Sequence, residues 1–162
     1  MGKKYIRVDD RLIHGQIITQ WTKYLNINVI IVIDDKTAKN SVLKKNMSMS
    51  VPQNYKTIIC SIDEAKEIIE KYDNTNSNVL VIVRFPEMLN KIASYGTKPE
   101  IINIGNVSKK DGSVFEVTHN VFLTKTDIEV IEELFKNNYK ITFQLVPDTS
   151  KITWKTEREK FI

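Results

Sequence analysis

The chain has 162 residues, of which 41% are hydrophobic and 27% are charged, and its formal net charge is +4. This composition indicates one soluble globular domain, residues 1–162, that is large enough to form a core without metal ions or disulfides. It excludes a membrane-spanning segment, since no apolar run is long enough, and an internal disulfide, since Cys60 is the one cysteine.

The first predicted elements are a strand over Tyr5–Val8 and a helix whose apolar stripe follows at helical spacing. That stripe consists of Ile17, Ile18, Trp21 and Leu25. Between strand and helix lies the stretch Asp9-Asp10-Arg11-Leu12-Ile13-His14-Gly15-Gln16, which places two carboxylates, an arginine and a histidine in one loop.

Further β-branched runs predict the remaining strands. They are Val29–Ile33, Tyr55–Cys60, Val79–Val83, Glu100–Ile104 and Lys140–Val146. Several of these runs are continuously apolar, which is typical of strands buried on both faces of a parallel sheet.

Helices are predicted between these strands. Ser61 and Glu64 have the spacing of a capping box, and apolar residues at helical spacing follow as far as Tyr72. Thr124 or Thr126 can cap a later helix, which is expected to end at Asn137-Asn138.

The segment before that later helix has a different pattern. Lys110-Asp111-Gly112 predicts a turn, and the residues from Val114 to Leu123 are expected to be extended around it as a further strand.

The near-regular alternation of strand and helix predicts an α/β fold: a doubly wound, mostly parallel open sheet of about six or seven strands with helices on both faces. Such sheets bind ligands beyond the carboxyl ends of their strands. Three later strand ends are therefore expected to meet the loop Asp9–His14 on the same rim: Asp34-Asp35, Arg84-Phe85-Pro86 and Gly105-Asn106.

Several classes of site lack their usual motif. There is no Gly-x-Gly-x-x-Gly after a strand, no glycine–lysine phosphate loop, no His/Cys cluster with metal spacing and no basic run with interleaved aromatics. The aspartate pairs Asp9-Asp10 and Asp34-Asp35 are compatible with magnesium, although adjacent aspartates are common at solvated strand ends. No nucleic acid, metal or cofactor is expected.

The opening loop suits phosphate chemistry. A helix that begins near His14 or Gly15 presents free amides and the positive end of its dipole to an anion. Arg11 supplies a planar fork that matches phosphate oxygens, and a neutral His14 imidazole can attack a phosphoryl group in line. The plainer alternative is a helix cap beside a surface ion pair between Arg11 and Asp9.

This stretch resembles the active-site motif of enzyme IIB of the mannose/fructose/sorbose family of the bacterial phosphoenolpyruvate-dependent sugar phosphotransferase system (PTS). The resemblance covers Arg7–Gln16 and Trp21, and it continues through Val29–Asp35, Arg84–Pro86 and the remainder of the chain. One departure is Asn106, which stands where the family has the second glycine of a Gly-Gly loop. Asparagine can adopt positive φ, so the turn is expected to survive.

The resemblance implies a phosphocarrier that acts as a protein-Npi-phosphohistidine–sugar phosphotransferase. His14 would accept a phosphoryl group on Nδ1 from a phosphohistidine of enzyme IIA. It would then pass the group to a sugar bound by the IIC/IID membrane transporter. The protein would be cytoplasmic, transiently associated with the membrane through the transporter, and possibly a homodimer.

The resemblance also implies roles for the other residues of the motif. Arg11 would neutralise the phosphate and Asp9 would brace the loop. Backbone amides at Ile13, Gly15 and Gln16 would add hydrogen bonds. Asp10, Phe85 and Gly105 are expected on the rim or in docking contacts. The other histidine, His119, lies in an extended segment and needs no function.

Two alternatives remain beside this prediction. One is a non-enzymatic binding or regulatory module that keeps the fold and responds to a phosphate-bearing ligand. The other is a nucleotide-binding α/β enzyme.

Overall fold

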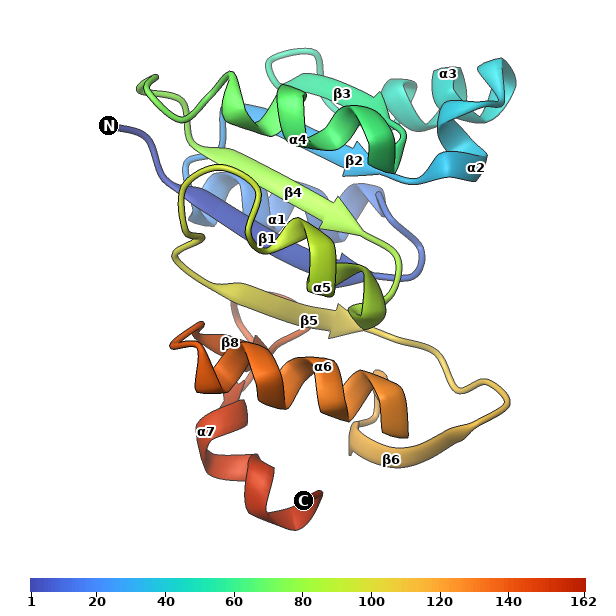
Figure 1. Ribbon diagram of the computed structural model, residues 1–162. Helices are drawn as coiled ribbons and strands as arrows, with labels where there is room; N and C mark the ends of the chain where they lie inside the picture. Colours follow the sequence, from blue (N-terminus) through green and yellow to red (C-terminus); the bar gives the residue numbers. More distant parts are fainter.

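The computed structural model describes residues 1–162, apart from the side chains of Gln16 and Ile17. A seven-stranded sheet in the order β3-β2-β4-β1-β5-β8-β9 forms its centre (Figure 1). The strands are β1 (Lys4–Asp9), β2 (Val29–Ile33), β3 (Lys56–Cys60), β4 (Val79–Val83), β5 (Ile102–Asn106), β8 (Ile141–Phe143) and β9 (Ile152–Thr153). All neighbours pair in parallel except β8 and β9, so the predicted mostly parallel sheet is confirmed.

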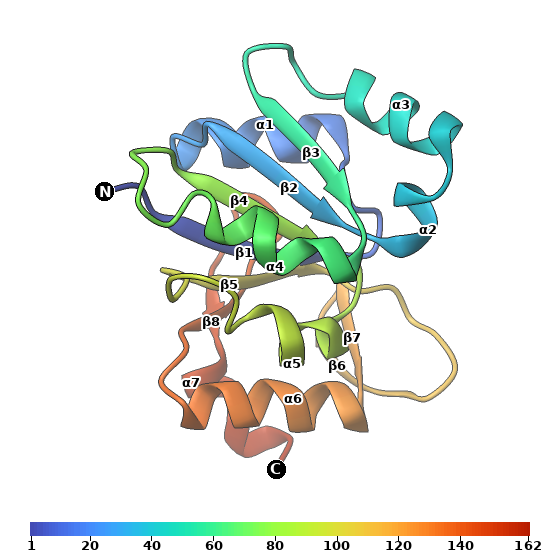
Figure 2. The ribbon, with the colours of Figure 1, turned by 45° about the horizontal axis from the view of Figure 1, so that its top comes forward.

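Helices cover both faces of this sheet (Figures 1 and 2). They are α1 (Gly15–Tyr24), α2 (Asp35–Ala38), α3 (Ser41–Met49), α4 (Ile62–Glu70), α5 (Leu89–Ile92), α6 (Lys125–Lys136) and α7 (Trp154–Glu157), with 3-10 turns at Pro86–Met88 and Arg158–Lys160. The predicted capping box is present at Ser61 with Glu64. Of the two threonines predicted as caps for the later helix, Thr124 is the N-cap, and it forms a capping box with Asp127. No helix among the described residues has the length and apolarity needed to cross a membrane.

The segment predicted to be extended around a turn forms a hairpin outside the main sheet. Strands β6 (Ser113–Thr118) and β7 (Val121–Thr124) pair antiparallel with each other. The predicted turn at Lys110–Gly112 is present and precedes this hairpin. The single further strand expected over Val114–Leu123 is instead two strands, because the chain reverses at His119-Asn120.

Alternation along the strands divides the core into two layers. In β2, Ile31 and Ile33 pack in the layer beneath α4, α5 and α6, whereas Ile30 and Val32 pack beneath α1. In β1, Ile6 and Val8 belong to the first layer. Side chains alternate across a strand, so Arg7 and Asp9 face the α1 side. The strand pattern thus puts a buried arginine two residues before the loop.

Lys4, at the start of β1, is a buried cation that makes stability depend on pH. It is 5% exposed and donates a hydrogen bond from Nζ to the carbonyl of Tyr95. Burial lowers its pKa from 10.5 to about 8, against the opposing charges of Asp73 and Glu70. Between these pH values the Lys4 amine is protonated in the unfolded chain and deprotonated in the folded chain. The free energy of unfolding therefore increases as the pH rises through this range.

Replacing Lys4 by methionine removes this contribution. We expect the difference in unfolding free energy between the wild type and Lys4→Met to shift in favour of the wild type as the pH rises from about 8 to 10.5. Urea unfolding of both proteins at several pH values measures it. A difference that stays constant over this window would contradict the assignment.

Candidate functional site

The loop after β1 turns sharply at the central strand of the sheet. The N–H of Leu12 donates to the carbonyl of Asp9 at 2.9 Å, and Leu12 has a φ of +60°. A non-glycine residue pays a conformational cost for this φ. The side chain of Leu12 is only 2% exposed and packs with Ile18 of α1, so burial holds the loop in this conformation.

Asp9 lies at the base of the loop between two arginines. It is 1% exposed, and its Oδ2 accepts a hydrogen bond from Nη2 of Arg7 at 3.2 Å. Its Oδ1 accepts from both the backbone N–H and the Nε of Arg11, at 3.0 and 3.2 Å. One carboxylate therefore binds the buried Arg7 to the 39% exposed Arg11.

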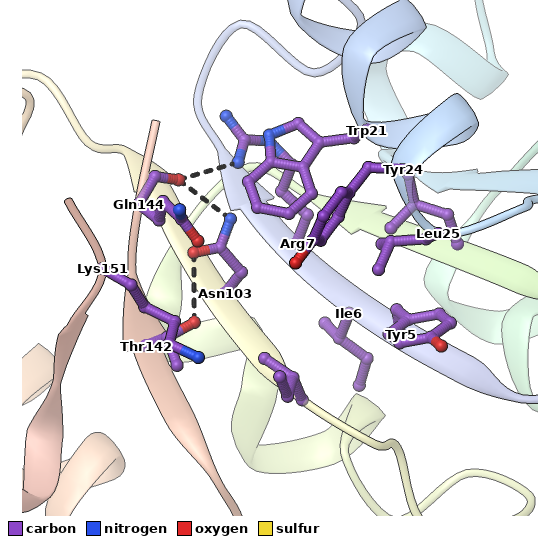
Figure 3. A pocket seen from close by; sticks show the side chains of 12 residues that line it. Tyr5, Ile6, Arg7, Trp21, Tyr24, Leu25, Asn103, Thr142, Gln144 and Lys151 are labelled. Atoms are coloured by element: carbon purple, nitrogen blue, oxygen red, sulfur yellow. Dashed lines mark hydrogen bonds between the residues drawn. The ribbon is translucent and has the colours of Figure 1, made fainter. Parts of the chain in front are cut away.

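Arg7 is anchored from the opposite end of the chain (Figure 3). Its Nη1 and Nη2 donate to the carbonyls of Gln144 and Leu145, at 3.2 and 3.0 Å. The Trp21 indole covers it, with the Arg7 Cζ 5.4 Å from the ring centroid, and donates to the same Leu145 carbonyl at 2.9 Å. Burial lowers the pKa of Arg7, and the adjacent Asp9 opposes this shift.

Gly105 makes room for the Arg7 guanidinium. A Cβ built on Gly105 would lie 2.2 Å from Cζ and Nη1 of Arg7, which no real side chain tolerates. Gly105 is buried in β5, so it offers no surface for the rim or docking contact predicted for it. Its place in the structure is a spacer that lets Arg7 reach Asp9.

Asp10 fastens the loop to β5. Its Oδ1 accepts a hydrogen bond from Nδ2 of Asn106 at 2.6 Å, and its Oδ2 accepts from the N–H of Ser108 at 2.7 Å. Asn106 lies in the extended backbone of β5, so the positive-φ turn expected there is wrong. The asparagine that replaces the second glycine thus binds Asp10.

Arg84 joins the loop to the neighbouring strand ends. Its Nη1 donates to the carbonyl of Asp10 at 2.7 Å, and its Nε and Nη2 donate to the two carboxylate oxygens of Asp34. Burial alone would raise the pKa of Asp34, but hydrogen bonds from Arg84 and Thr37 outweigh it and lower the pKa. The prediction that these strand ends meet the loop on one rim is confirmed.

His14 stands exposed at the end of this braced loop. It is the N-cap residue of α1, with an extended backbone, and its side chain makes no capping hydrogen bond. The half-buried Ile13 and Gly15 flank it, while the side chain of Gln16 lies outside the described residues. The start of α1 therefore fixes the backbone of His14, whose carbonyl accepts from the N–H of Ile18 at 2.9 Å, while the imidazole side chain is exposed on the surface.

Other predicted residues lie farther out or have other partners. Phe85 is half-buried, with Nζ of Lys110 4.3 Å from its ring centroid. Asp35 accepts a hydrogen bond from the N–H of Ile62 at 2.8 Å. Among the described residues, no group of three or more His, Cys, Asp or Glu side chains is arranged to hold a metal ion.

This arrangement is suited to a covalent reaction at an exposed imidazole. A nucleophilic ring, an arginine in the same loop and the start of α1 provide a nucleophile and positive charge for an anionic group. Sequence reasoning assigned no role to Arg7 or Arg84. An arginine in the middle of an otherwise apolar strand, two residues before an aspartate, is the signal that points to Arg7.

Known proteins share this sequence and fold. Residues 3–160 match the family model described as the PTS system sorbose subfamily IIB component. A probable phosphotransferase enzyme IIB component of Streptococcus pyogenes is 31% identical over 152 residues, which cover 91% of this chain and 93% of that protein. The Escherichia coli mannose-specific EIIAB component is 29% identical over 90% of this chain, which spans 45% of that relative's length.

Solved structures have the same architecture. The structure described as manxB from Thermoanaerobacter tengcongensis superposes with a TM-score of 0.87 at 28% identity and covers 100% of this chain and 98% of that one. The IIB domain of the sorbose permease from Klebsiella pneumoniae has a TM-score of 0.88 at 24% identity, covering 100% and 99% of the two chains. The predicted fold class is confirmed.

Proposed function

The chain belongs to the sorbose-subfamily IIB components of the sugar phosphotransferase system, and from this premise we propose that His14 carries the phosphoryl group that passes through the protein. The observation that supports this is the placement of His14: an exposed imidazole on a loop fastened at Asp9, Asp10 and Leu12. IIB components are phosphotransferases of the sugar PTS.

The first step is transfer from a phosphohistidine of enzyme IIA to Nδ1 of His14. The N–P bond of the donor breaks as the N–P bond of His14 forms. The leaving ring takes up a proton, and the His14 ring releases one. In the second step a sugar hydroxyl forms an O–P bond, the N–P bond of His14 breaks, and the hydroxyl proton goes to the ring. Both steps require alignment and charge neutralisation above all.

The surrounding residues divide these tasks. Arg11 directs positive charge toward the phosphoryl oxygens, with backbone amides of Ile13, Gly15 and Gln16 as further donors. Asp9 holds Arg11 by both the backbone and the side chain, and Asp10 ties the loop to β5. The carboxylates face arginine and amide groups, which keeps their negative charge partly neutralised beside an anion.

The partners follow from the same proposal. Enzyme IIA is the donor, and the IIC/IID transporter with its bound sugar is the acceptor, so the protein works in the cytoplasm and meets the membrane through the transporter. The mannose-specific relative is named an EIIAB component, and this name combines the IIA and IIB designations in one protein. The alternative, a phosphate-responsive binding module, uses the same exposed loop without transfer.

Transfer with purified components separates these functions. Phosphoenolpyruvate, the general phosphotransferase proteins and the cognate IIA should label the protein with a bond that is labile in acid and stable in base. The label should leave on addition of transporter vesicles and sugar. A protein that binds phosphorylated IIA but remains unlabelled would support the binding module instead.

A further inference from the structure

The net positive charge of the chain is concentrated in one segment beside the candidate site. Residues 36–54 contain four lysines and no acidic residue. Since the whole chain has 24 basic and 20 acidic residues, the remainder is balanced at 20 of each. The four lysines, Lys36, Lys39, Lys44 and Lys45, are all exposed, and they lie on α2, on α3 and between them.

Helix α3 also exposes apolar side chains. No residue of this helix is buried, and Val42, Leu43 and Met49 are 64%, 38% and 73% exposed. They are three of the seven large hydrophobic residues that are exposed among the described residues.

Acidic groups adjoin the lysines at two places. Asp35 is exposed at the start of α2, and the pKa of Glu64, lowered mainly by hydrogen bonds with Ser61, is lowered further by the nearby Lys44. Exposed apolar side chains with a mainly positive rim are typical of a surface that binds another macromolecule.

This helix adjoins the reactive loop. An open groove runs between the C-terminal end of α3 and the start of α1, and its lining includes Met49, Ser50, Gly15 and Thr19. A Cβ on Gly15 would lie 3.9 Å from the carbonyl oxygen of Ser50. Gly15 follows His14 directly, so a protein that covers His14 on this side also covers the end of α3. In Figure 1, α2 and α3 lie at the edge of the sheet where the parallel strands end.

We propose that α3 with its flanking lysines, residues 36–54, is the docking surface for the phosphoryl donor, enzyme IIA, and that it binds an acidic face of that protein around an apolar contact. This inference rests on the proposed function. The charge favours an anionic partner, and phosphorylated IIA is more negative than the protein left after transfer. The lysines therefore accelerate the encounter with phosphorylated IIA. Their attraction for IIA weakens once the phosphate has moved to His14.

Charge reversal on α3 tests the proposal. In Lys44→Glu/Lys45→Glu, we expect kcat/KM for transfer from phosphorylated IIA to fall about tenfold at low ionic strength, mainly through KM. The difference in kcat/KM between the wild type and this variant should narrow as salt is added, because exposed charges are screened.

Val42→Asp tests the apolar contact. Its decrease in kcat/KM should persist at high salt.

Matched variants keep the comparison specific. Lys136→Glu/Lys140→Glu makes the same change of net charge at exposed lysines at and beyond the end of α6, and Val114→Asp changes a residue that is 63% exposed on the hairpin. Both should retain wild-type transfer. Circular dichroism and thermal unfolding confirm that each variant is folded. Equal defects in the matched variants would overturn the proposal.

A small donor separates docking from chemistry. Phosphoramidate should label the wild type and Lys44→Glu/Lys45→Glu equally, since it needs no protein surface. A wild type labelled by neither donor would defeat the proposed function and this inference with it.

Two results would assign the surface to another partner. Normal transfer from IIA to Lys44→Glu/Lys45→Glu, with slowed delivery from that variant to sugar, would assign the surface to the transporter. Co-sedimentation of the wild type with phosphatidylglycerol vesicles, lost in the variant, would assign it to lipid. Either result would refute the IIA surface.

Discussion

Replacing His14 by alanine should abolish phosphoryl transfer from IIA, leaving label at background. No second nucleophile stands in the loop, since Arg11 is cationic and the aspartates are held by arginine and amide groups. The His14 side chain is exposed and makes no capping hydrogen bond, so the free energy of unfolding should change by no more than about 0.5 kcal/mol. Transfer with radiolabelled phosphate and urea unfolding measure the two effects.

The chain supplies its own control for this variant. His119 has a fully exposed side chain on the hairpin reversal, where it lies 3.3 Å from Glu116. His119→Ala removes the other histidine without touching the loop and should be labelled like the wild type. Label retained at full yield in His14→Ala would mean that another residue is the acceptor.

Replacing Asp9 by alanine should both destabilise the protein and slow transfer. Removing one partner of a buried ion pair leaves the other charge uncompensated, and we expect a loss of about 3 kcal/mol from the free energy of unfolding. Arg7 is the charge left behind, since it is 2% exposed. Arg11 loses its anchor at the same time, so phosphoryl acceptance falls even where the variant is folded.

Two further variants separate stability from chemistry at Asp9. Arg7→Met/Asp9→Leu removes both charges and should regain part of the stability, because apolar residues can replace a buried pair, but not the transfer rate. Asp111→Ala, at an exposed turn, should match the wild type in both. If the Asp9→Ala variant had the same free energy of unfolding as the Asp111→Ala variant, the buried pair would contribute nothing to stability.

Most of the sheet follows from local pattern. The apolar runs of β2 and β4 are buried at every position, which is the condition under which a continuous run predicts a parallel strand. The caps at Ser61 and Thr124 involve residues three apart, so they too can be identified from sequence. The short β8, by contrast, is shorter than the apolar run that predicted it.

Helix α3 was not predicted because it carries no such pattern. A helix that buries no residue has no apolar stripe, and its start depends on Asn40, whose side chain accepts hydrogen bonds from the N–H groups of Val42 and Leu43. Because α3 is exposed along most of its length, its sequence has no periodic apolar pattern from which a helix could be predicted. The same exposure supports its proposed role in docking.

Of the site, the sequence predicted only the residues that lie together in one loop. The motif supplies Asp9, Arg11 and His14, but the buried Arg7 depends on carbonyls 137 and 138 residues away and on a glycine in β5. Asn106 shows the same limit: its backbone tendency suggested a turn, whereas its partner, Asp10, lies 96 residues away. Contacts of this range are decided by the packing of the whole sheet.

The central claim is tested most directly by locating the phosphate after transfer from IIA. The chain has two histidines, so digestion under alkaline conditions and tandem mass spectrometry of the peptides distinguish them. We predict phosphate on the peptide that contains His14 and none on the peptide that contains His119. Phosphate on His119, or on neither histidine in a protein that has accepted label, would contradict the claim.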